Sequence, residues 1–245
     1  MGFDADVFWS GLTSAVFFKA AGVTLALTFV AHLAAILVSL PLALALESRR
    51  QLVRAMVKGY VGVFRAIPTL LLLLFFWNAL PQFHPIFRSH WYTPFLAAWL
   101  ALTINEAAYQ VEINRAALKA VDKGQIAAAA AFGFGRLQSF RLIVLPQATR
   151  VALPPTINEF VTLLKATSLA SVISLQELMT VTSQAVATSF QFKEYYLIAT
   201  LYYLAIVGLL TLVQQRVEAS FDWTRERRPG AGSLVRRVGL RWSRR

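Results

Sequence analysis

The sequence predicts an all-α integral membrane protein: a bundle of about five transmembrane helices with a basic cytoplasmic loop. Of its 245 residues, 57% are hydrophobic and only 15% are charged, whereas charged residues make up about a quarter of an ordinary soluble domain. Uncharged runs long enough to cross a bilayer recur along the chain, and basic residues gather between them. We therefore expect one helical membrane domain with its N-terminus outside and its C-terminus inside.

The first predicted span covers residues 20–46, which contain no Asp, Glu, Lys or Arg. About 20 apolar residues suffice to cross a bilayer, so this span is tilted or over-long. Two acids, Asp4 and Asp6, precede it, and basic residues follow it at Arg49, Arg50, Arg54 and Lys58. Because basic residues favour the cytoplasmic side, the N-terminus is expected outside and residues 47–60 inside. No basic segment precedes the first apolar run, so we expect no cleavable signal peptide.

Four further spans are predicted near residues 63–82, 93–113, 150–173 and 195–215. Together with the first they form one membrane domain over residues 1–220. The Ser- and Thr-rich segment 174–194 is the least definite, and it either lies along the outer surface or partly re-enters the membrane. The Arg-rich tail 221–245 is expected inside, either disordered, resting on anionic lipid, or serving as a topology signal.

Several function classes are excluded by composition and motif. The chain has no cysteine, which excludes disulfides, thiolate nucleophiles and Cys-ligated metal sites. His32, His84 and His90 lack metal-ligand spacing, and no Gly-Lys dipeptide, HExxH or GxSxG occurs; we therefore expect no metal, no nucleotide-binding P-loop and no hydrolase site. The net charge of +12 belongs to loops beside apolar runs, so nucleic-acid binding is not expected.

The loop over residues 112–146 is the most informative segment, because it is both basic and helix-prone. Its charges at Lys119, Lys123, Arg136 and Arg141 place it on the cytoplasmic side. Residues 119–124 form a predicted turn, and residues 125–132 are almost all alanine, the best helix former. Gly133 and Gly135 end that helix, and a second amphipathic helix is expected over residues 136–145, stopped at Pro146.

This loop resembles the signature loop of ABC importer permeases: Glu-Ala-Ala, three residues, Gly, nine residues, then Ile-x-Leu-Pro. The residues in register are Ala128, Ala129, Gly133, Ile143, Leu145 and Pro146. The preceding Tyr109, Glu112, Arg115, Gly124 and Gln125 resemble the polar amino acid branch. One position departs from the pattern, because Ala127 stands where the family has glutamate, which puts one polar contact of the loop in doubt.

Two more segments resemble the same family. YVGVFRAIPTLLLLLF, with Phe64, Arg65 and Pro68, is similar to its second span. LLKATSLASVISLQEL, with Lys165, Thr167, Ser168, Leu169 and Glu177-Leu178, is similar to the exit of its fourth span. With the spans between them, these motifs cover about residues 20–215. The resemblance implies a multi-pass permease in a bacterial inner membrane, where residues 119–146 form coupling helices that dock on a cytoplasmic ATPase.

The resemblance also implies partners and cofactors. It implies an ABC ATPase dimer, a second permease copy or a homologous permease, a periplasmic binding protein that delivers a polar amino acid, and membrane lipids. ATP and Mg²⁺ would be bound by the ATPase and none by this chain, which is not itself an enzyme.

Charged residues inside the spans indicate a candidate substrate path, because each costs about 2.5–3.5 kcal/mol at mid-helix unless it has a partner or a watery cavity. Helical spacing puts Asn105, Tyr109 and Glu112 on one face of the third span, and Asn158, Thr162 and Lys165 on one face of the fourth. Glu106 and Glu159 lie at similar depth. We predict that these faces line a cavity where the two glutamates bind a substrate ammonium and Lys165 a carboxylate. Structural ion pairs between the helices remain an equal alternative. Glu112 with Arg115 is expected to fix the base of the third span rather than to touch substrate.

Two other functions remain open. A self-contained secondary transporter would use the same intramembrane charges, but it has no use for a coupling loop. An integral membrane enzyme would use Glu106, Glu159 and Lys165 as an acid–base set, but no residue pattern activates a nucleophile. Association with an ATPase discriminates between these functions and the importer.

Overall fold

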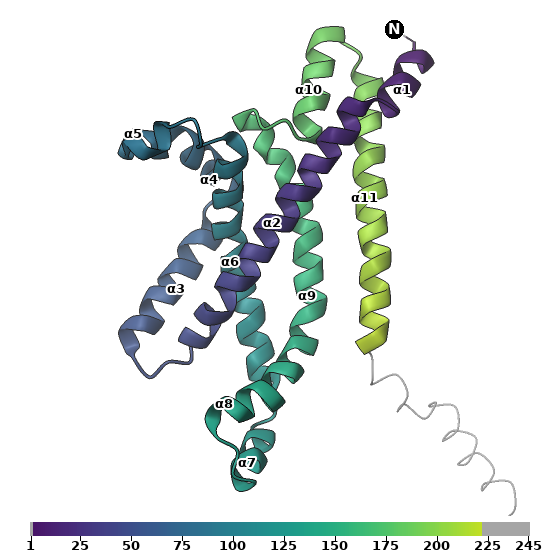
Figure 1. Ribbon diagram of the computed structural model, residues 1–245. Coiled ribbons are helices and arrows are strands. Elements are labelled where there is room, and N and C mark those ends of the chain that lie inside the picture. Colours follow the sequence, from purple (N-terminus) through teal and green to yellow (C-terminus); the bar gives the residue numbers. More distant parts are fainter. Residues whose placement is uncertain (1, 222–245) are drawn as a thin grey trace, which may run out of the picture.

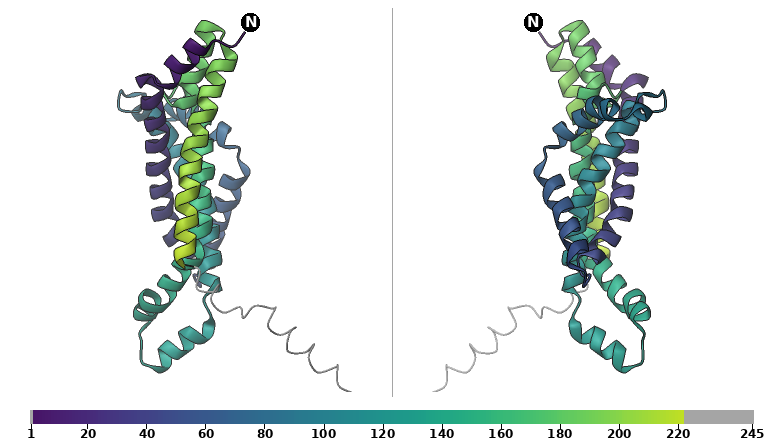
Figure 2. Two further views of the ribbon diagram at one scale, coloured as in Figure 1. Left: turned by 90° about the vertical axis from the view of Figure 1, so that its right-hand side faces the viewer. Right: turned by 90° about the vertical axis from the view of Figure 1, so that its left-hand side faces the viewer.

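The computed structural model describes residues 2–221, and all regular structure within that range is helical. The N-terminus, α1 (Ala5–Leu12) and α10 (Leu178–Ser189) lie at one end of an elongated bundle (Figure 1). Two short helices, α7 (Lys123–Ala131) and α8 (Arg136–Ser139), project beyond the opposite end, as the side views also show (Figure 2). The predicted basic tail, 221–245, lies outside the described residues except for Phe221.

The first predicted span corresponds to α2 (Ala15–Ala45), which begins at Ala15 rather than at residue 20. Its N-terminus is capped by Ser14, whose hydroxyl accepts a hydrogen bond from the Phe17 amide. Its 31 residues span about 46 Å at 1.5 Å per residue, more than a hydrocarbon core of about 30 Å. Fully buried Leu27, Ala31 and Ala35 recur every four residues on the stripe that packs against α6 (Pro94–Ala120).

The second predicted span, 63–82, is wrong as a single helix. The chain instead forms α3 (Gln51–Ala66), then α4 (Thr69–Leu74), a π-helical turn η1 (Phe75–Ala79) and α5 (Leu80–Phe83), with a bend of 100° between α3 and the segment from Thr69 onward. Pro68 causes the break, because proline has no amide hydrogen and disfavours helical geometry in the residue before it. Ile67 is accordingly extended, with ψ 128°.

The centre of the bundle is α6, which packs against α2, α3, α4 and α9 (Leu145–Ala166). It is longer than the predicted third span, 93–113, and Thr93 caps its first turn. The largest hydrophobic core surrounds it and combines Leu27, Leu73, Leu102, Leu163 and Ile173. Helix α6 is therefore a shared packing partner of α2, α3, α4 and α9, whereas α11 packs against α9, α1 and α10.

The fourth predicted span, 150–173, is formed by α9 and the 3₁₀ helix η4 (Thr167–Ile173), and the fifth, 195–215, by α11 (Phe192–Phe221). The segment between them contains α10, which packs against α2, α11 and η4. Both oxygens of Glu177 cap α10 by accepting from the amides of Met179 and Thr180. Burial raises the pKa of this carboxyl above its usual range, and the two amide hydrogen bonds partly oppose the shift.

Only some helices have the length and apolarity of a membrane span by themselves. In the described range these are α2 and the Phe192–Val217 part of α11, or three spans if α3 to α5 count as one broken span. The more polar α6 and α9 do not meet that criterion. These two helices carry Glu106 and Glu159. Charged residues of this kind lower the mean hydropathy of α6 and α9.

Candidate functional site

A buried polar cluster lies near the middle of the bundle, where α2, α6 and α9 meet. His32 Nδ1 of α2 is 3.1 Å from Glu106 Oε1 of α6. The same oxygen accepts a hydrogen bond of 3.0 Å from Gln110 Nε2, one helical turn further along α6. Gln110 Oε1 in turn accepts from the Thr156 hydroxyl of α9 at 3.1 Å. One hydrogen-bonded chain therefore joins three helices through side chains that are buried or half-buried.

Glu159 extends this cluster on α9. Its carboxyl is half-buried and interacts electrostatically with Glu106, His32 and Arg65. The Arg65 guanidinium lies over the Tyr109 ring, 5.1 Å from its centroid, a geometry favourable for a cation–π interaction. The electrostatic interaction between Glu106 and Glu159 indicates that the two carboxylates lie near each other between α6 and α9, and their common depth in the membrane stays a prediction.

Asn105 is buried, and both ends of its side-chain amide are hydrogen-bonded. Its Nδ2 donates to the Phe64 carbonyl at 2.6 Å, and its Oδ1 accepts from the Thr69 hydroxyl at 3.3 Å. Phe64 and Thr69 flank the break at Pro68, so Asn105 ties both halves of the broken helix to α6. This residue supports the site rather than offering a free polar group to a substrate.

The other polar residues predicted for the path lie on a separate exposed strip of α9. Asn158, Thr162 and Lys165 are all exposed in the single chain, and the Thr162 hydroxyl donates to the Asn158 carbonyl. Lys165 follows Glu159 by six positions, which at 100° per residue puts the two on different faces. Glu112 is half-buried and pairs with Arg115 at 2.5 Å, as expected for the base of α6. The predicted path therefore divides into an internal cluster and an outward-facing strip.

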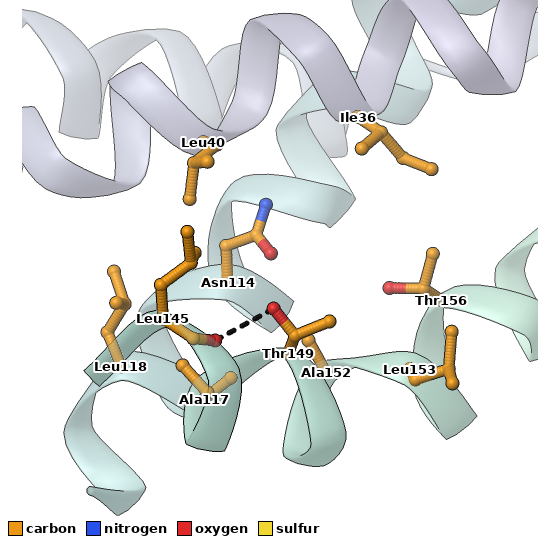
Figure 3. A pocket seen from close by; sticks show the side chains of 11 residues that line it. Ile36, Leu40, Asn114, Ala117, Leu118, Leu145, Thr149, Ala152, Leu153 and Thr156 are labelled. Atoms are coloured by element: carbon orange, nitrogen blue, oxygen red, sulfur yellow. Dashed lines mark hydrogen bonds between the residues drawn. The ribbon is translucent and has the colours of Figure 1, made fainter. Parts of the chain in front are cut away.

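An apolar cavity of about 210 Å³ lies between α2, α6 and α9 on the side of the cluster nearer the loop (Figure 3). Ile36 and Leu40 line it from α2, Ala117 from α6, and Ala152 and Thr156 from α9. Thr156 thus borders the cavity and also belongs to the cluster. At the base, Asn114 Nδ2 donates to Ser39 Oγ at 2.9 Å, which joins α6 to α2. The three helices are therefore loosely packed between the cluster and the loop.

The loop itself begins with α7, as the alanine run predicts. Asp122 caps the helix by accepting a 2.6 Å hydrogen bond from the Gly124 amide. A Cβ atom on Gly124 would lie 2.7 Å from the Asp122 carboxylate oxygen, so a larger residue here would force the capping side chain of Asp122 to move. Gly133 ends the helix with φ +81°. The Gly133 amide donates to Ala130 and the Phe134 amide to Ala129, a Schellman arrangement that requires a left-handed residue at this position.

The predicted stop at Pro146 is wrong. Helix α8 continues through a π-helical turn, η3 (Phe140–Val144), directly into α9. Pro146 is tolerated because it lies in the first turn after η3, where the hydrogen-bonding register has already shifted. Gln147 Nε2 donates to the Ile143 carbonyl at 3.0 Å. The second half of the loop is therefore one continuous helical path into the span that carries Glu159.

The surface of the projecting loop is markedly apolar for an exposed element. Phe132 is 84% exposed and Leu137 is 68% exposed, and Ile126 and Phe134 are also exposed. Gln125, Ala127 and Ala128 lie on the exposed surface of α7, whereas Ala129 is buried. At the base of the loop, Ile143 and Leu145 are half-buried and Pro146 is exposed. Exposed apolar side chains on a projecting element are typical of a docking surface.

Sequence reasoning missed two members of the cluster, Gln110 and Thr156. Their spacing was a usable signal, because Gln110 follows Glu106 by one helical turn and Thr156 precedes Glu159 by three residues. His32 is hydrogen-bonded to Glu106 and packs edge-on against the Phe160 ring, with the two ring centroids 5.2 Å apart.

Residues 35–223 match the family model of the binding-protein-dependent transport system inner membrane component. The chain belongs to this family. It is similar to the probable amino-acid ABC transporter permease protein YckA of Bacillus subtilis, with 34% identity over 83% of this chain and 88% of YckA. It is also similar to the nopaline transport system permease protein NocM of Agrobacterium fabrum, with 35% identity over 82% of this chain and 83% of NocM.

A solved structure agrees with these relatives. The crystal structure of an amino acid ABC transporter with histidines contains a chain that is 30% identical, with a TM-score of 0.79 over 90% of this permease and 100% of that chain. The family resemblance drawn from the loop motif is thereby confirmed, and the helical bundle has the fold of an ABC importer permease. Its relatives are transport subunits, which agrees with the expectation that this permease is not itself an enzyme.

Proposed function

We propose that this permease spans a bacterial inner membrane five times, with its N-terminus outside, and carries a polar amino acid inward. The five spans are α2, the broken segment α3 to α5, α6, α9 with η4, and α11. The domain extends over residues 1–220, with 221–245 as a separate basic tail. The positive-inside rule supports this orientation. The segment after the first span is basic, with Arg49, Arg50, Arg54 and Lys58, and so is the loop between the third and fourth spans, so both belong on the cytoplasmic side.

One observation carries the proposal: α6 and α9 hold the acidic cluster, and the same two helices enter and leave the projecting loop. A rigid-body movement of α7 and α8 therefore reaches Glu106 and Glu159 without any intermediate element. The apolar cavity between these helices leaves room for a change in their packing. Ala127 in place of the family's glutamate shifts the docking of α7 toward apolar contacts, which Phe132 and Ile126 supply.

We infer the partners from the family and from two exposed surfaces, the apolar loop and the polar strip of α9. The apolar loop surface fits a cleft of a cytoplasmic ABC ATPase, which would bind ATP and Mg²⁺ and supply the energy. The exposed polar strip of α9, Asn158, Thr162 and Lys165, cannot face lipid without a large cost, so a second permease copy or a homologous permease would cover it. A periplasmic binding protein would deliver the substrate to the end that carries α1 and α10.

The substrate class rests on the names of the relatives and on the charges of the cluster. The two carboxylates and Arg65 offer partners for both the ammonium and the carboxylate of an amino acid, and Lys165 adds a second cation on the separate exposed strip of α9. A self-contained carrier is disfavoured, because it would have no use for the projecting loop.

Co-purification tests this proposal. The chain is co-expressed with the ATPase encoded beside it and isolated through a tag on the permease. We expect a stable complex whose ATPase activity rises when the adjacent binding protein is added with a polar amino acid. A permease that transports an amino acid in proteoliposomes without any ATPase would instead establish the carrier function.

A further inference from the structure

We propose that a charged pocket between the C-terminal end of α2, the first half of α3 and the last turns of α6 binds the headgroup of an anionic phospholipid through its phosphodiester. The lipid class that fits is phosphatidylglycerol, whose headgroup has one negative charge and no cation. This inference rests on the proposed orientation, which puts the pocket at the inner leaflet. It goes beyond the proposed transport by assigning a second binding site.

The pocket is a cavity of about 510 Å³ whose lining is mostly charged. Helices α2, α3 and α6 pack against one another around it, so the backbones that carry these side chains are fixed relative to each other. Four of the charged residues are cationic and two are anionic, which leaves a formal charge of +2. They are Glu47 after α2, Arg54 and Lys58 on α3, and Glu112, Arg115 and Lys119 on α6.

Both carboxylates of the pocket already have cationic partners on α6. Glu112 accepts two hydrogen bonds from the guanidinium of Arg115. Glu47 Oε1 lies 3.8 Å from Lys119 Nζ, and both of these side chains are more than half exposed. The carboxylates therefore neutralise the cations of α6 and leave those of α3 without a counter-charge.

The two cations of α3 are the groups that an anionic ligand can reach. Arg54 Nη1 donates to the backbone carbonyl of Ser48 at 3.2 Å, a contact that orients the guanidinium without neutralising it. Lys58 has no hydrogen bond or ion pair within residues 2–221. Arg54 and Lys58 are four residues apart, so they lie on one face of α3. A phosphodiester can accept from both, since arginine and lysine are the residues that commonly bind phosphate oxygens.

The outer surface of α3 indicates that the pocket lies beside lipid. Leu52, Met56 and Val63 are 73%, 67% and 52% exposed, and their spacing of four and seven residues puts them on one face of the helix. An amphipathic helix with such a face lies where headgroups meet acyl chains. Lys58 falls between Met56 and Val63 along α3, so the pocket is at the level of this apolar face. Leu44, one turn before Glu47, is also exposed.

The chemistry of the pocket favours an anionic headgroup over a zwitterionic one. Basic pockets between helices on the cytoplasmic side are typical sites for anionic headgroups. A choline or ethanolamine headgroup would bring its own cation toward Arg54 and Lys58, which already lack a counter-charge. The hydroxyls of a glycerol headgroup carry no charge and can donate to the oxygens of Glu112 or Glu47.

The test measures lipid retention on the purified permease–ATPase complex by native mass spectrometry. The complex, in a neutral detergent, is titrated with phosphatidylglycerol or with phosphatidylcholine of the same acyl chains. The intact complex should retain phosphatidylglycerol preferentially. Arg54→Gln combined with Lys58→Gln should weaken phosphatidylglycerol binding on the order of ten- to thirtyfold and leave phosphatidylcholine binding unchanged.

A matched pair of substitutions controls for net charge. Arg49→Gln combined with Arg50→Gln removes the same charge from neighbouring exposed residues that do not line the pocket, so most of the binding should remain. The Arg-rich segment 221–245 is present in every variant, and any lipid that it binds cancels in the comparison. Equal losses in the two double variants, or equal retention of both lipids by the intact complex, would overturn the proposed site.

A substitution with the opposite effect guards against misfolded variants. Glu47→Gln removes the partner of Lys119 and should strengthen phosphatidylglycerol binding several-fold, a gain that a folding defect does not produce. Inorganic phosphate in large molar excess should not displace the lipid. Displacement by inorganic phosphate would show a site for a soluble anion and would overturn the assignment to a lipid.

Further measurements distinguish this inference from the proposed function. Because the chain has no cysteine, Arg49→Cys can be labelled with a membrane-impermeant maleimide. Labelling from the cytoplasmic side alone would support the inner-leaflet position, and labelling from outside would overturn the orientation. A permease that binds no ATPase would overturn the importer function, while the same lipid titration on the permease alone would still decide whether the pocket binds phosphatidylglycerol.

Discussion

The side-chain amide of Asn105 donates a 2.6 Å hydrogen bond to the carbonyl of Phe64. In an uninterrupted helix this carbonyl would accept from the amide four residues later, and that residue is Pro68, which has no amide hydrogen. Asn105 therefore replaces the missing helical donor from a neighbouring helix. The break that bends α3 away from α4 by 100° is thus satisfied and held in place by the central helix of the bundle.

Replacing Asn105 by alanine should destabilise the permease by about 1–3 kcal/mol, because the half-buried Phe64 carbonyl would lose its partner. The melting temperature in detergent measures the effect. Asn158→Ala is the matched control, since Asn158 is exposed and the same change there should leave the melting temperature nearly unchanged. Equal losses at both positions would contradict the role assigned to Asn105.

Gly133→Val should impair coupling between the loop and the spans. Gly133 adopts φ +81°, and a left-handed conformation costs an L-residue about 1–2 kcal/mol, so the hairpin between α7 and α8 should open or tilt. We expect a several-fold loss of substrate-stimulated ATPase activity in the reconstituted complex. Gly62→Val is the control, because Gly62 lies in open space on α3. A similar loss in both variants would argue against a special role for the loop turn.

Phe132→Asp should abolish association with the ATPase, because it places a charge at the most exposed apolar side chain of the loop. Pull-down through a tag on the permease measures association. Phe83→Asp provides the comparison, since Phe83 is 74% exposed but belongs to α5, outside the loop. Retention of the ATPase by the Phe132 variant would show that docking uses a different surface.

Filling the cavity between α2, α6 and α9 should restrict the movement of these three helices between the loop and the polar cluster. Ala152→Leu introduces apolar atoms into a space of about 210 Å³, which should raise stability by about 1–2 kcal/mol. It should also lower stimulated ATPase activity, because the helices could no longer repack. Ala205→Leu, at an exposed position of α11, should alter neither quantity. Unchanged stimulation in the filled variant would show that transport does not use this cavity.

The exposed strip of α9 should lie at the contact with a second permease. The chain contains no cysteine, so a single Thr162→Cys can be cross-linked with a short bifunctional maleimide in membranes. We expect a cross-linked pair, either of two copies or of this chain with a cysteine in a homologous permease. Phe29→Cys, which is 60% exposed on α2, should give none. Cross-linking through Phe29 but not through Thr162 would place the contact on α2 instead of α9.

The sequence was sufficient to predict the helical membrane bundle, the alanine-rich helix and the turn at Gly133, because each depends on local composition and spacing. It did not predict that α3 and α4 form a broken span, since the uncharged run through Pro68 looks like any other apolar span. The stop expected at Pro146 failed for a related reason. A π-helical turn, whose register no local pattern reveals, allows the helix to continue through that proline.

The candidate site could be predicted only in part. Helical spacing predicted a common depth for Glu106 and Glu159, but it could not show which polar residues face inward. The side-chain amide of Asn105 is hydrogen-bonded to Phe64 and Thr69, and Lys165 lies on a different face of α9 from Glu159. The first fact depends on how α3 and α6 pack against each other, which a single sequence does not reveal. The second follows from the six-residue spacing on α9 and was readable from the sequence.

The most direct test of the importer function is the ATPase activity of a complex reconstituted from this permease, its adjacent ATPase and the adjacent binding protein. Activity is measured with a panel of amino acids, for the intact permease and for Gly133→Pro, which lacks the left-handed turn of the loop. We predict stimulation by one class of amino acid with the intact permease and none with the variant. An ATPase that never associates with the permease, or stimulation that is equal in both, would contradict the account.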